Sequence, residues 1–345
     1  MRIFIVSGRP RRREQAKRST QSMHSVDIIV PCYNEAEVLD SFLQESERVL
    51  SAVEGYCFHY IFINDGSRDG TLEILRRLSR DHERVHYLSF SRNFGKEAAM
   101  YAGLKHSTGD YVIVMDADLQ HPPALIPEMI REIEAGHDCA AACRKSRKGE
   151  KSLTSHISGL FYRFSNSLSD VKMPQNAVDF RMMSRPMVDA ILKLSEVERF
   201  SKGIFVWVGF DTVWIPYENV ERTMGTSKWS FRSLLKYAVD GITSFTVKPL
   251  KLIRNSGILL FIGATLYLLI TLIKTLIMGK DVPGYASLLC VMLFLGGTLQ
   301  LSLGIVGEYI SHIYLEAKDR PVYILQESDM ASPEITPDPR RKEQA

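Results

Sequence analysis

Asp116 and Asp118 are acidic residues separated by one position, and they follow directly after an apolar run of the sequence. In an extended chain, side chains two positions apart point to the same side, so both carboxylates face one direction. Oxygen ligands of this kind suit Mg²⁺ or Mn²⁺, above all where a diphosphate supplies further oxygens. Either aspartate alone could instead cap the helix that follows. The spacing therefore indicates a site for a divalent cation beside a phosphorylated ligand.

Other polar segments stand in comparable positions, each directly after a short apolar run. They are PCYNE (31–35), NDGSRDG (64–70), SRNFGKEAA (91–99) and CRKSRKG (143–149). If the apolar runs are strands, these segments meet DADLQH (116–121) at the carboxyl edge of one sheet, where α/β folds bind ligands. Asp65, in a tight turn with Gly66, can accept hydrogen bonds from a base or ribose, as can Asn34 and Glu35. Taken singly, the same residues are also typical of turns and helix caps.

Composition excludes several classes of protein. The formal charge of +3 over 345 residues is too small to indicate nucleic-acid binding, and we expect no nucleic-acid partner. The five cysteines form no Cys-x-x-Cys pair, so a disulfide framework or structural zinc is not expected. Neither G-x-G-x-x-G nor G-x-x-x-x-G-K-[ST] occurs, which removes the usual dinucleotide and phosphate-loop sites.

The elements that must position these residues follow an alternating pattern. Between residues 26 and 144, short β-branched runs alternate with helical stretches, which predicts repeated βαβ units and a mostly parallel sheet. The pattern predicts helices at 35–53 and 71–80, and strands at 26–33, 60–64, 85–90, 111–115 and 139–143.

Two later segments, 256–278 and 285–310, are apolar enough to span a bilayer, which takes about 20 residues in a helix. A buried hairpin of a soluble protein is the alternative. An even number of spans returns the chain to its starting side. Basic residues are more frequent outside the pair than at its turn, which predicts a cytoplasmic α/β domain and two cytoplasmic termini. The flanking bases are Lys248, Lys251, Arg254, Lys318 and Arg320, and those near the turn are Lys274 and Lys280.

The remaining segments complete the predicted domain organisation. Residues 1–24 form a basic arm that we expect to be disordered, with contact to anionic lipid as the alternative. We expect the α/β domain at 25–228, interfacial amphipathic helices at 229–253, a two-helix membrane hairpin at 254–312 and a cytoplasmic tail at 313–345. The segment 229–249 could equally pack on the α/β domain. No cleaved signal sequence is expected.

Several motifs in order resemble one family. VDIIVPCYNEAEVL, FINDGSRDGT, SRNFGKEAAMYAGLKHSTGDYVIVMDADLQHPP, DFRMMSR, SKGIFVWVGF and GTSKWSF are similar to the family 2 glycosyltransferases of the dolichyl-phosphate mannose synthase and bactoprenol glucosyltransferase type. The resemblance covers about residues 26–320. It implies a GT-A fold, a uridine or guanosine diphosphate sugar as donor, with uridine favoured, and inversion at the anomeric carbon. It also implies a polyprenyl phosphate acceptor, such as undecaprenyl phosphate, at a membrane.

The resemblance also implies roles for individual residues. Asp116, Asp118 and Gln120 match the positions that hold the metal, Mg²⁺ or Mn²⁺. Asp179 matches a position near the reaction centre, where it would orient acceptor or sugar, although Arg181 could simply pair with it. Asn64 departs from the family, because many relatives carry Asp there. The residues that match or neighbour the nucleotide-sugar pocket are Pro31, Tyr33, Asn34, Glu35, Asp65, Lys96 and Asp116.

The acceptor chemistry calls for cations and no strong base. A lipid phosphate is already largely anionic at neutral pH, so it can attack once it is positioned and its charge is screened. We expect Arg222, counted with Asp118 and Asp179 among the catalytic residues, to act on this phosphate. The other candidates for the acceptor phosphate are Arg144, Arg147, Lys202, Ser227 and Lys228.

Alternative functions remain open from the sequence. A processive polysaccharide synthase would carry Q-x-x-R-W and more spans, and the chain has neither. Transfer to a diacylglycerol or ceramide hydroxyl would require a real catalytic base. An inactive membrane scaffold that binds sugar nucleotides is the alternative from another class. The sugar is not encoded in any motif, and we expect a homo-oligomer, such as a tetramer.

Overall fold

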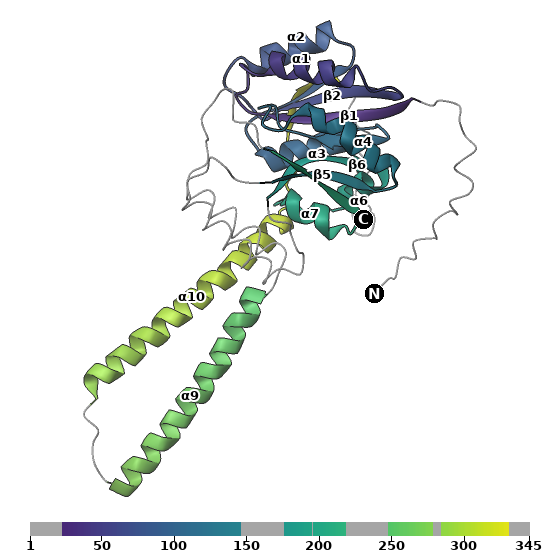
Figure 1. The fold of residues 1–345 in the computed structure, drawn as a ribbon. Helices are drawn as coiled ribbons and strands as arrows, with labels where there is room; N and C mark the ends of the chain where they lie inside the picture. Colours follow the sequence, from purple (N-terminus) through teal and green to yellow (C-terminus); the bar gives the residue numbers. More distant parts are fainter. Residues whose placement is uncertain (1–22, 146–175, 195, 219–247, 279–283, 331–345) are drawn as a thin grey trace, which may run out of the picture.

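The computed structural model describes residues 23–145, 176–194, 196–218, 248–278 and 284–330. An α/β domain carries a long pair of helices that projects away from it (Figure 1). In chain order the elements are β1 (His24–Cys32), α1 (Leu39–Leu50), β2 (Tyr56–Asn64), α2 (Thr71–Asp81), β3 (Val85–Phe90), α3 (Lys96–His106), β4 (Tyr111–Val114), η2 (Pro123–Leu125), α4 (Ile126–Glu134), β5 (Cys139–Arg144), β6 (Ala177–Ser184), α6 (Arg185–Leu192), α7 (Ser201–Trp207), β7 (Thr212–Tyr217), α9 (Lys248–Met278), α10 (Tyr285–Ala317) and β8 (Leu325–Ser328).

The described strands form one sheet in the order β7-β5-β6-β4-β1-β2-β3-β8. Strands β4, β1, β2 and β3 run parallel, as the alternating pattern predicted, so the α/β fold class is confirmed. Strand β6 is antiparallel to both β4 and β5. It was not predicted, and it brings a further motif, DFRMMSR, beside the end of β4.

Both faces of the sheet are covered, which explains the unbroken apolar runs in β1 and β4. Leu39, Phe42 and Leu75 of α1 and α2 pack on one face. Helices α3, α6 and α7 pack on the other. Helix α3 approaches closely because Gly103 has no side chain, and a Cβ there would lie 2.3 Å from Ile29 Cγ2. This approach brings the first turn of α3 to the carboxyl edge of the sheet.

Element boundaries differ modestly from prediction. Strand β2 begins at Tyr56, before the predicted start at residue 60, because its first residues are buried on one face only. The first helix begins at Leu39 instead of residue 35, since residues 34 and 35 belong to a turn. The predicted helix at 71–80 is confirmed as Thr71–Asp81.

The projecting helices correspond to the predicted hairpin. Helix α9 over Lys248–Thr271 has a mean hydropathy of 1.7, and among the described residues it alone is long and apolar enough to cross a membrane. Helix α10 runs beside it back to the α/β domain, with exposed apolar side chains such as Leu299 and Leu303 (Figure 1). The second span therefore remains a prediction. Of the predicted interfacial segment 229–253, residues up to 247 lie outside the described part, and Lys248 already begins α9.

The chain returns to the sheet after α10. Part of the segment predicted as a tail is strand β8, antiparallel to β3 at the sheet edge. Glu327 pairs with Arg76, 2.8 Å from its Nε, and accepts a hydrogen bond from the Tyr87 hydroxyl. These bonds lower the pKa of Glu327 to about 2. Asp329 accepts hydrogen bonds from the Tyr87 main-chain N–H at 2.7 Å and from the Ser79 hydroxyl.

Replacing Asp329 with Ala should therefore loosen β8. Hydrogen bonds to a partly buried carboxylate contribute about 2 kcal/mol together, and their loss should lower the melting temperature of the detergent-solubilised chain by several degrees. Asp40→Ala is the matched control, because its pair with Arg77 is exposed on both sides and contributes little to stability. Equal melting temperatures for the two variants would contradict the anchoring role of Asp329.

Candidate active site

The predicted ligand segments meet at the carboxyl edge of β1 and β2, as expected. The main-chain N–H of Asn34 donates to Ser67 Oγ at 2.9 Å, and its side-chain oxygen accepts the N–H of Arg68 at 2.8 Å. The N–H of Glu35 donates to Thr71 Oγ1 at 3.0 Å. Asn34 has a positive φ of 54°, a conformation that asparagine tolerates better than most residues. These bonds join PCYNE and NDGSRDG into one rim, with Pro31 at the end of β1 and Tyr33 in the turn.

Asp65 is buried in this rim, and its carboxylate holds the next loop. It accepts the main-chain N–H groups of Phe94 at 2.6 Å and Gly95 at 2.9 Å. Burial raises its pKa to about 6, partly offset by these N–H groups and by Arg92. Gly66 has φ +61°, and a Cβ there would lie 2.3 Å from the Arg92 carbonyl carbon. The contact of Asp65 with a nucleotide remains a prediction, whereas its role in fixing this loop is observed.

The neighbouring Asn64 has a structural explanation. It is buried, its amide nitrogen donates to Ser89 Oγ at 2.9 Å, and its oxygen accepts the N–H of Ser67 at 3.1 Å. Both ends of the Asn64 amide therefore have a hydrogen-bond partner. The residue that departs from the family at this position is thus hydrogen-bonded to its immediate neighbours.

The centre of the site is a charge cluster formed by Lys96, Asp116 and Asp179. The Lys96 ammonium lies 2.6 Å from Asp116 Oδ1 and 2.8 Å from Asp179 Oδ2. Lys96 begins α3, Asp116 follows β4, and Asp179 lies on β6, so three elements converge on one cation. Lys96 and Asp116 were both predicted to bind the nucleotide sugar, and Asp179 was predicted separately as a catalytic residue. In the structure all three are in contact.

The alternative partner of Asp179 was Arg181, and that pairing of side chains is wrong. The buried Arg181 guanidinium donates to the main-chain oxygens of Val178 at 2.9 Å and Asp179 at 3.3 Å. Its other face covers the ring of Phe205, 3.9 Å from the ring centre. Sequence spacing favoured the neighbour two residues away, whereas packing of α3 on the sheet supplied Lys96.

The cluster is ionised at neutral pH. Burial by itself would raise the pKa of Asp116, but Lys96 and His121 outweigh it and lower that pKa below its usual range. Burial also raises the pKa of Asp179, but the positive charges of Lys96 and Lys202 outweigh it and lower that pKa to about 2. Burial lowers the pKa of Lys96, yet the two carboxylates raise it overall. Asp179 is thus a poor proton acceptor.

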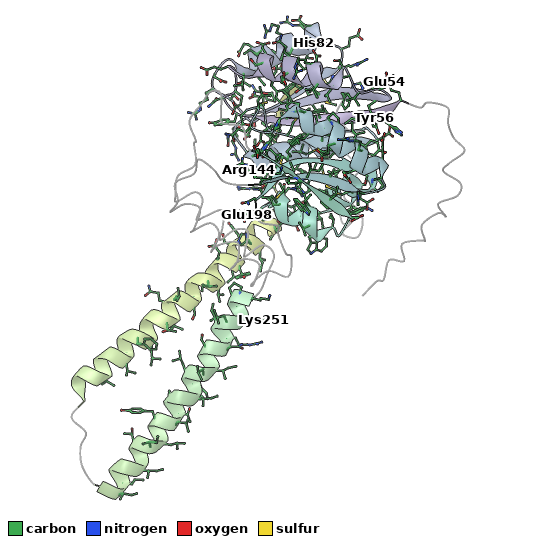
Figure 2. All side chains as sticks on the ribbon, in the orientation of Figure 1. Glu54, Tyr56, His82, Arg144, Glu198 and Lys251 are labelled. Carbon is green, nitrogen blue, oxygen red and sulfur yellow. The ribbon has the colours of Figure 1, made fainter. Side chains whose placement is uncertain are left out.

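A second set of contacts connects this cluster to β5 and β7. His121 Nε2 lies 3.6 Å from Asp116 Oδ2, and His121 Nδ1 lies 2.7 Å from the Tyr217 hydroxyl. That hydroxyl accepts a hydrogen bond from Arg144 Nε at 3.3 Å. Figure 2 shows Arg144 on the side of the domain from which the helix pair projects. Arg144, predicted for the acceptor phosphate, is thereby linked to the acidic residues predicted for the donor.

Asp118 lies close to the same group of residues. Its Oδ1 accepts the N–H of Gln120 at 3.1 Å, which forms a tight turn with Leu119 at φ 55°. The pKa of Tyr217 is raised, first by burial, against the effect of Arg144 and with contributions from the charges of Asp116 and Asp118. Within the described residues, no set of three or more His, Cys, Asp or Glu side chains is arranged to hold a metal.

Other predicted residues are placed only in part. Lys202 lies on α7, and its charge is one of those that lower the pKa of Asp179. Arg147, Arg222, Ser227 and Lys228 lie outside the described residues. Sequence reasoning missed Glu97 and Ser201, which bond to each other behind the cluster. The only signal for Glu97 was its place beside Lys96, and nothing distinguished Ser201.

Comparisons with known proteins identify the family of the chain. Residues 27–192 match the glycosyl transferase family 2 model, and residues 248–313 match the GtrB C-terminal hairpin. A putative glycosyltransferase of Bacillus subtilis, CsbB, is 46% identical over 310 residues, which is 90% of this chain and 94% of that protein. The chain belongs to glycosyl transferase family 2. The resemblance noted from the motifs is confirmed, and the protein is a glycosyltransferase.

A further relative is similar over most of the chain. The bactoprenol glucosyl transferase of Shigella phage SfII is 40% identical over 308 residues, covering 89% of this chain and 99% of that one. Among solved structures, glucosyl-3-phosphoglycerate synthase from Mycobacterium tuberculosis, with Mn²⁺, UDP and phosphoglyceric acid, is 17% identical, with a TM-score of 0.47. The alignment covers 64% of this chain and 76% of that chain.

The buried charge of Asp65 predicts a pH dependence of stability. Its folded pKa of about 6 lies above the ordinary value of 3.8, so the folded state binds the extra proton between these values. The contribution of Asp65 to stability is therefore greatest at low pH and is lost as pH rises from about 4 to about 6. Asp65→Asn lacks this titration. The melting temperature of wild type relative to Asp65→Asn should fall across this range, and a constant or rising difference would contradict the assignment.

Loss of the central cation should disable the enzyme. Lys96→Met leaves the Asp116 and Asp179 carboxylates facing each other without their shared ammonium, and we expect turnover to fall by about 100-fold or more. Lys105→Met, an exposed lysine in the last turn of the same helix, is the control and should keep its activity. Sugar-transfer rates and melting temperatures of both variants test this, and near-normal turnover of Lys96→Met would refute it.

Proposed function

We propose that this glycosyltransferase moves one hexose-type sugar, with inversion, from a nucleotide diphosphate sugar to polyprenyl phosphate. The products are a polyprenyl-phosphate sugar and a nucleoside diphosphate. A UDP-sugar is the favoured donor, and a GDP-sugar is the alternative. The observation that carries the proposal is the charge cluster of Lys96, Asp116 and Asp179, in a chain that also has a helix pair with exposed apolar side chains. The similarity of the chain to a bactoprenol glucosyl transferase supports polyprenyl phosphate as the acceptor.

A divalent cation, Mg²⁺ or Mn²⁺, fits the donor set of the site. Asp116 is ionised, and Asp118 and Gln120 place carboxylate and amide oxygens in the same turn. Three protein oxygens leave positions for diphosphate oxygens and water, which is how these ions are usually held beside phosphates. When bound, such an ion would screen the charge that develops on the leaving diphosphate. Lys96 supplies a further positive charge at the same carboxylate.

The acceptor side needs positioning more than proton removal. With a pKa of about 2 and a lysine on its carboxylate, Asp179 is suited to orienting a group and poorly suited to deprotonating an alcohol. This favours a phosphate acceptor over a diacylglycerol or ceramide hydroxyl. Lys202 and Arg144 are the described cations proposed for the acceptor phosphate, and Arg147, Arg222, Ser227 and Lys228 stay as proposals from the sequence.

The membrane arrangement extends the same proposal. Helix α9 and the match to the GtrB C-terminal hairpin support a two-span protein in the cytoplasmic membrane, with the α/β domain and both termini on the cytoplasmic side. Lys251 lies on α9 near the α/β domain (Figure 2), where a positively charged side chain would face the lipid headgroups. Self-association into a homo-oligomer, such as a tetramer, remains part of the proposal. Cross-linking in native membranes tests it, and recovery of monomer alone would count against it.

The reaction is tested by product analysis. Membranes that contain the protein are incubated with undecaprenyl phosphate, Mn²⁺ and a panel of radiolabelled nucleotide sugars, and lipids are then extracted. A polyprenyl-phosphate sugar is released by mild acid and survives alkali, whereas a sugar on diacylglycerol survives the acid treatment. Labelled lipid that is released by acid and survives alkali supports the proposal. Labelled lipid that survives acid would favour the glycolipid alternative, and binding of donor without transfer would favour the scaffold alternative.

The metal assignment gives a direct prediction. Asp118→Ala should lower transfer by at least about 100-fold, because a ligand to the ion at the leaving diphosphate is lost. The variant should still fold and sit in the membrane, since Asp118 lies in a surface turn. Asp81→Ala, an exposed aspartate at the end of α2, is the control. Unchanged turnover of Asp118→Ala, measured with saturating Mn²⁺, would exclude this metal assignment.

A further inference from the structure

Glu97 is an acidic side chain of the active-site region that the proposed reaction does not use. It is the second residue of α3, and its Oε2 accepts the main-chain N–H of Ser201 at 2.9 Å and also the Ser201 hydroxyl. Ser201 is buried and is the first residue of α7. One carboxylate oxygen therefore joins the start of α3 to the start of α7.

The residues next to this bond are both lysines, and both act on Asp179. Lys96 precedes Glu97 and contacts Asp179 Oδ2 at 2.8 Å. Lys202 follows Ser201, and its charge helps to lower the pKa of Asp179. The bond between Glu97 and Ser201 thus joins the two main-chain positions next to these lysines. Lys96 belongs to the donor side of the site, and Lys202 is proposed for the acceptor side.

Burying a carboxylate between two helices costs free energy, because the charge loses its contact with water. Burial and the nearby charge of Asp179 raise the pKa of Glu97, and the Ser201 donors and Lys96 act against them. An apolar contact would hold the helices together without this cost, but it would not fix a direction. Charge-assisted hydrogen bonds are short and directional, so they set the position and rotation of the first turn of α7.

The segment just before α7 is held from the opposite side by the hairpin. The main-chain N–H of Val197 donates to Glu316 Oε1 at 2.6 Å, and His312 pairs with Glu198. Glu198 marks the place where α10 meets the α/β domain (Figure 2). The start of α7 therefore lies between the helix that carries Lys96 and the helix that leads out of the proposed membrane hairpin.

We propose that Glu97 is a positioning residue for sugar transfer, which sets Lys202 on α7 against Lys96 on α3 so that acceptor phosphate and donor diphosphate meet beside Asp179. The inference rests on the proposed function. Glu97 contacts neither substrate, and it acts through Ser201. Its loss should therefore impair use of the acceptor while leaving nucleotide binding intact, because Asp65 and the rim around it are held by separate bonds.

The test compares Glu97→Ala with Glu97→Gln in the full chain, reconstituted in lipid nanodiscs. For Glu97→Ala, kcat/KM for undecaprenyl phosphate should fall by about 10- to 100-fold, the range expected when a reacting group is misplaced by an ångström or less. Binding of UDP, measured by calorimetry, should stay within about twofold of wild type. Glu97→Gln keeps an oxygen that can accept the Ser201 bonds, so it should recover most of the activity.

Ser201→Ala serves as a second variant, because it removes only the hydroxyl donor and keeps the main-chain bond. It should impair the acceptor kcat/KM in the same direction, by less than Glu97→Ala. Ser79→Ala is the matched control, since it deletes another hydrogen bond from serine to a carboxylate, at the far edge of the sheet. It should leave the acceptor kcat/KM unchanged.

The outcomes separate this inference from the proposed function. Wild-type transfer to undecaprenyl phosphate in the same assay tests the function itself. The role of Glu97 is overturned by wild-type acceptor kinetics in Glu97→Ala, or by Gln as inactive as Ala, which would mean that charge and not position matters. Should Glu97→Ala fail to fold, Ser201→Ala decides, and unchanged acceptor kcat/KM in that variant would reject the proposal.

Discussion

The Lys96 ammonium, held between the Asp116 and Asp179 carboxylates, is the interaction on which the site depends. Charges that are partly removed from water interact strongly, so the ends of α3, β4 and β6 must meet within hydrogen-bonding distance. The close packing of α3 over the sheet at Gly103 makes that meeting possible. Lys96, together with His121 and Lys202, keeps the two carboxylates ionised, and ionised oxygens are the ligands that a divalent cation beside a diphosphate requires.

The same constraint explains how donor and acceptor chemistry can share one place. On one side, the rim around Asp65 and Asn34 is fixed by main-chain hydrogen bonds that do not involve the cluster. On the other, Ser201 at the start of α7 is bonded to Glu97, the neighbour of Lys96, and Val197 just before α7 is bonded to Glu316 of α10. The active site is thus built between a rigid sheet edge and the part of the chain proposed to enter the bilayer.

Much of this arrangement could be predicted from the sequence, for identifiable reasons. Unbroken apolar runs located the parallel strands, and the polar segments after them located the ligand edge, because the carboxyl ends of parallel strands coincide. The partner of Asp179 was beyond such reasoning, since Lys96 is 83 positions away and reaches it only through packing of α3. Strand β6 lacked the alternating pattern of a βαβ unit, and β8 looked like part of a polar tail. Glu97 and Ser201 carry no motif, and only the contact between their helices reveals them.

Strand β8 has a consequence for how the protein is made. It follows α10 in the chain, yet it covers the outer edge of β3 and is fastened there by Glu327 and Asp329. During synthesis, the ribosome must therefore deliver both helices of the hairpin before the sheet can be finished. Until then β3 is an open edge, the kind of surface through which nascent chains pair wrongly with one another. The edge of β3 is therefore covered only after α9 and α10 have been synthesised, so the sheet is completed late.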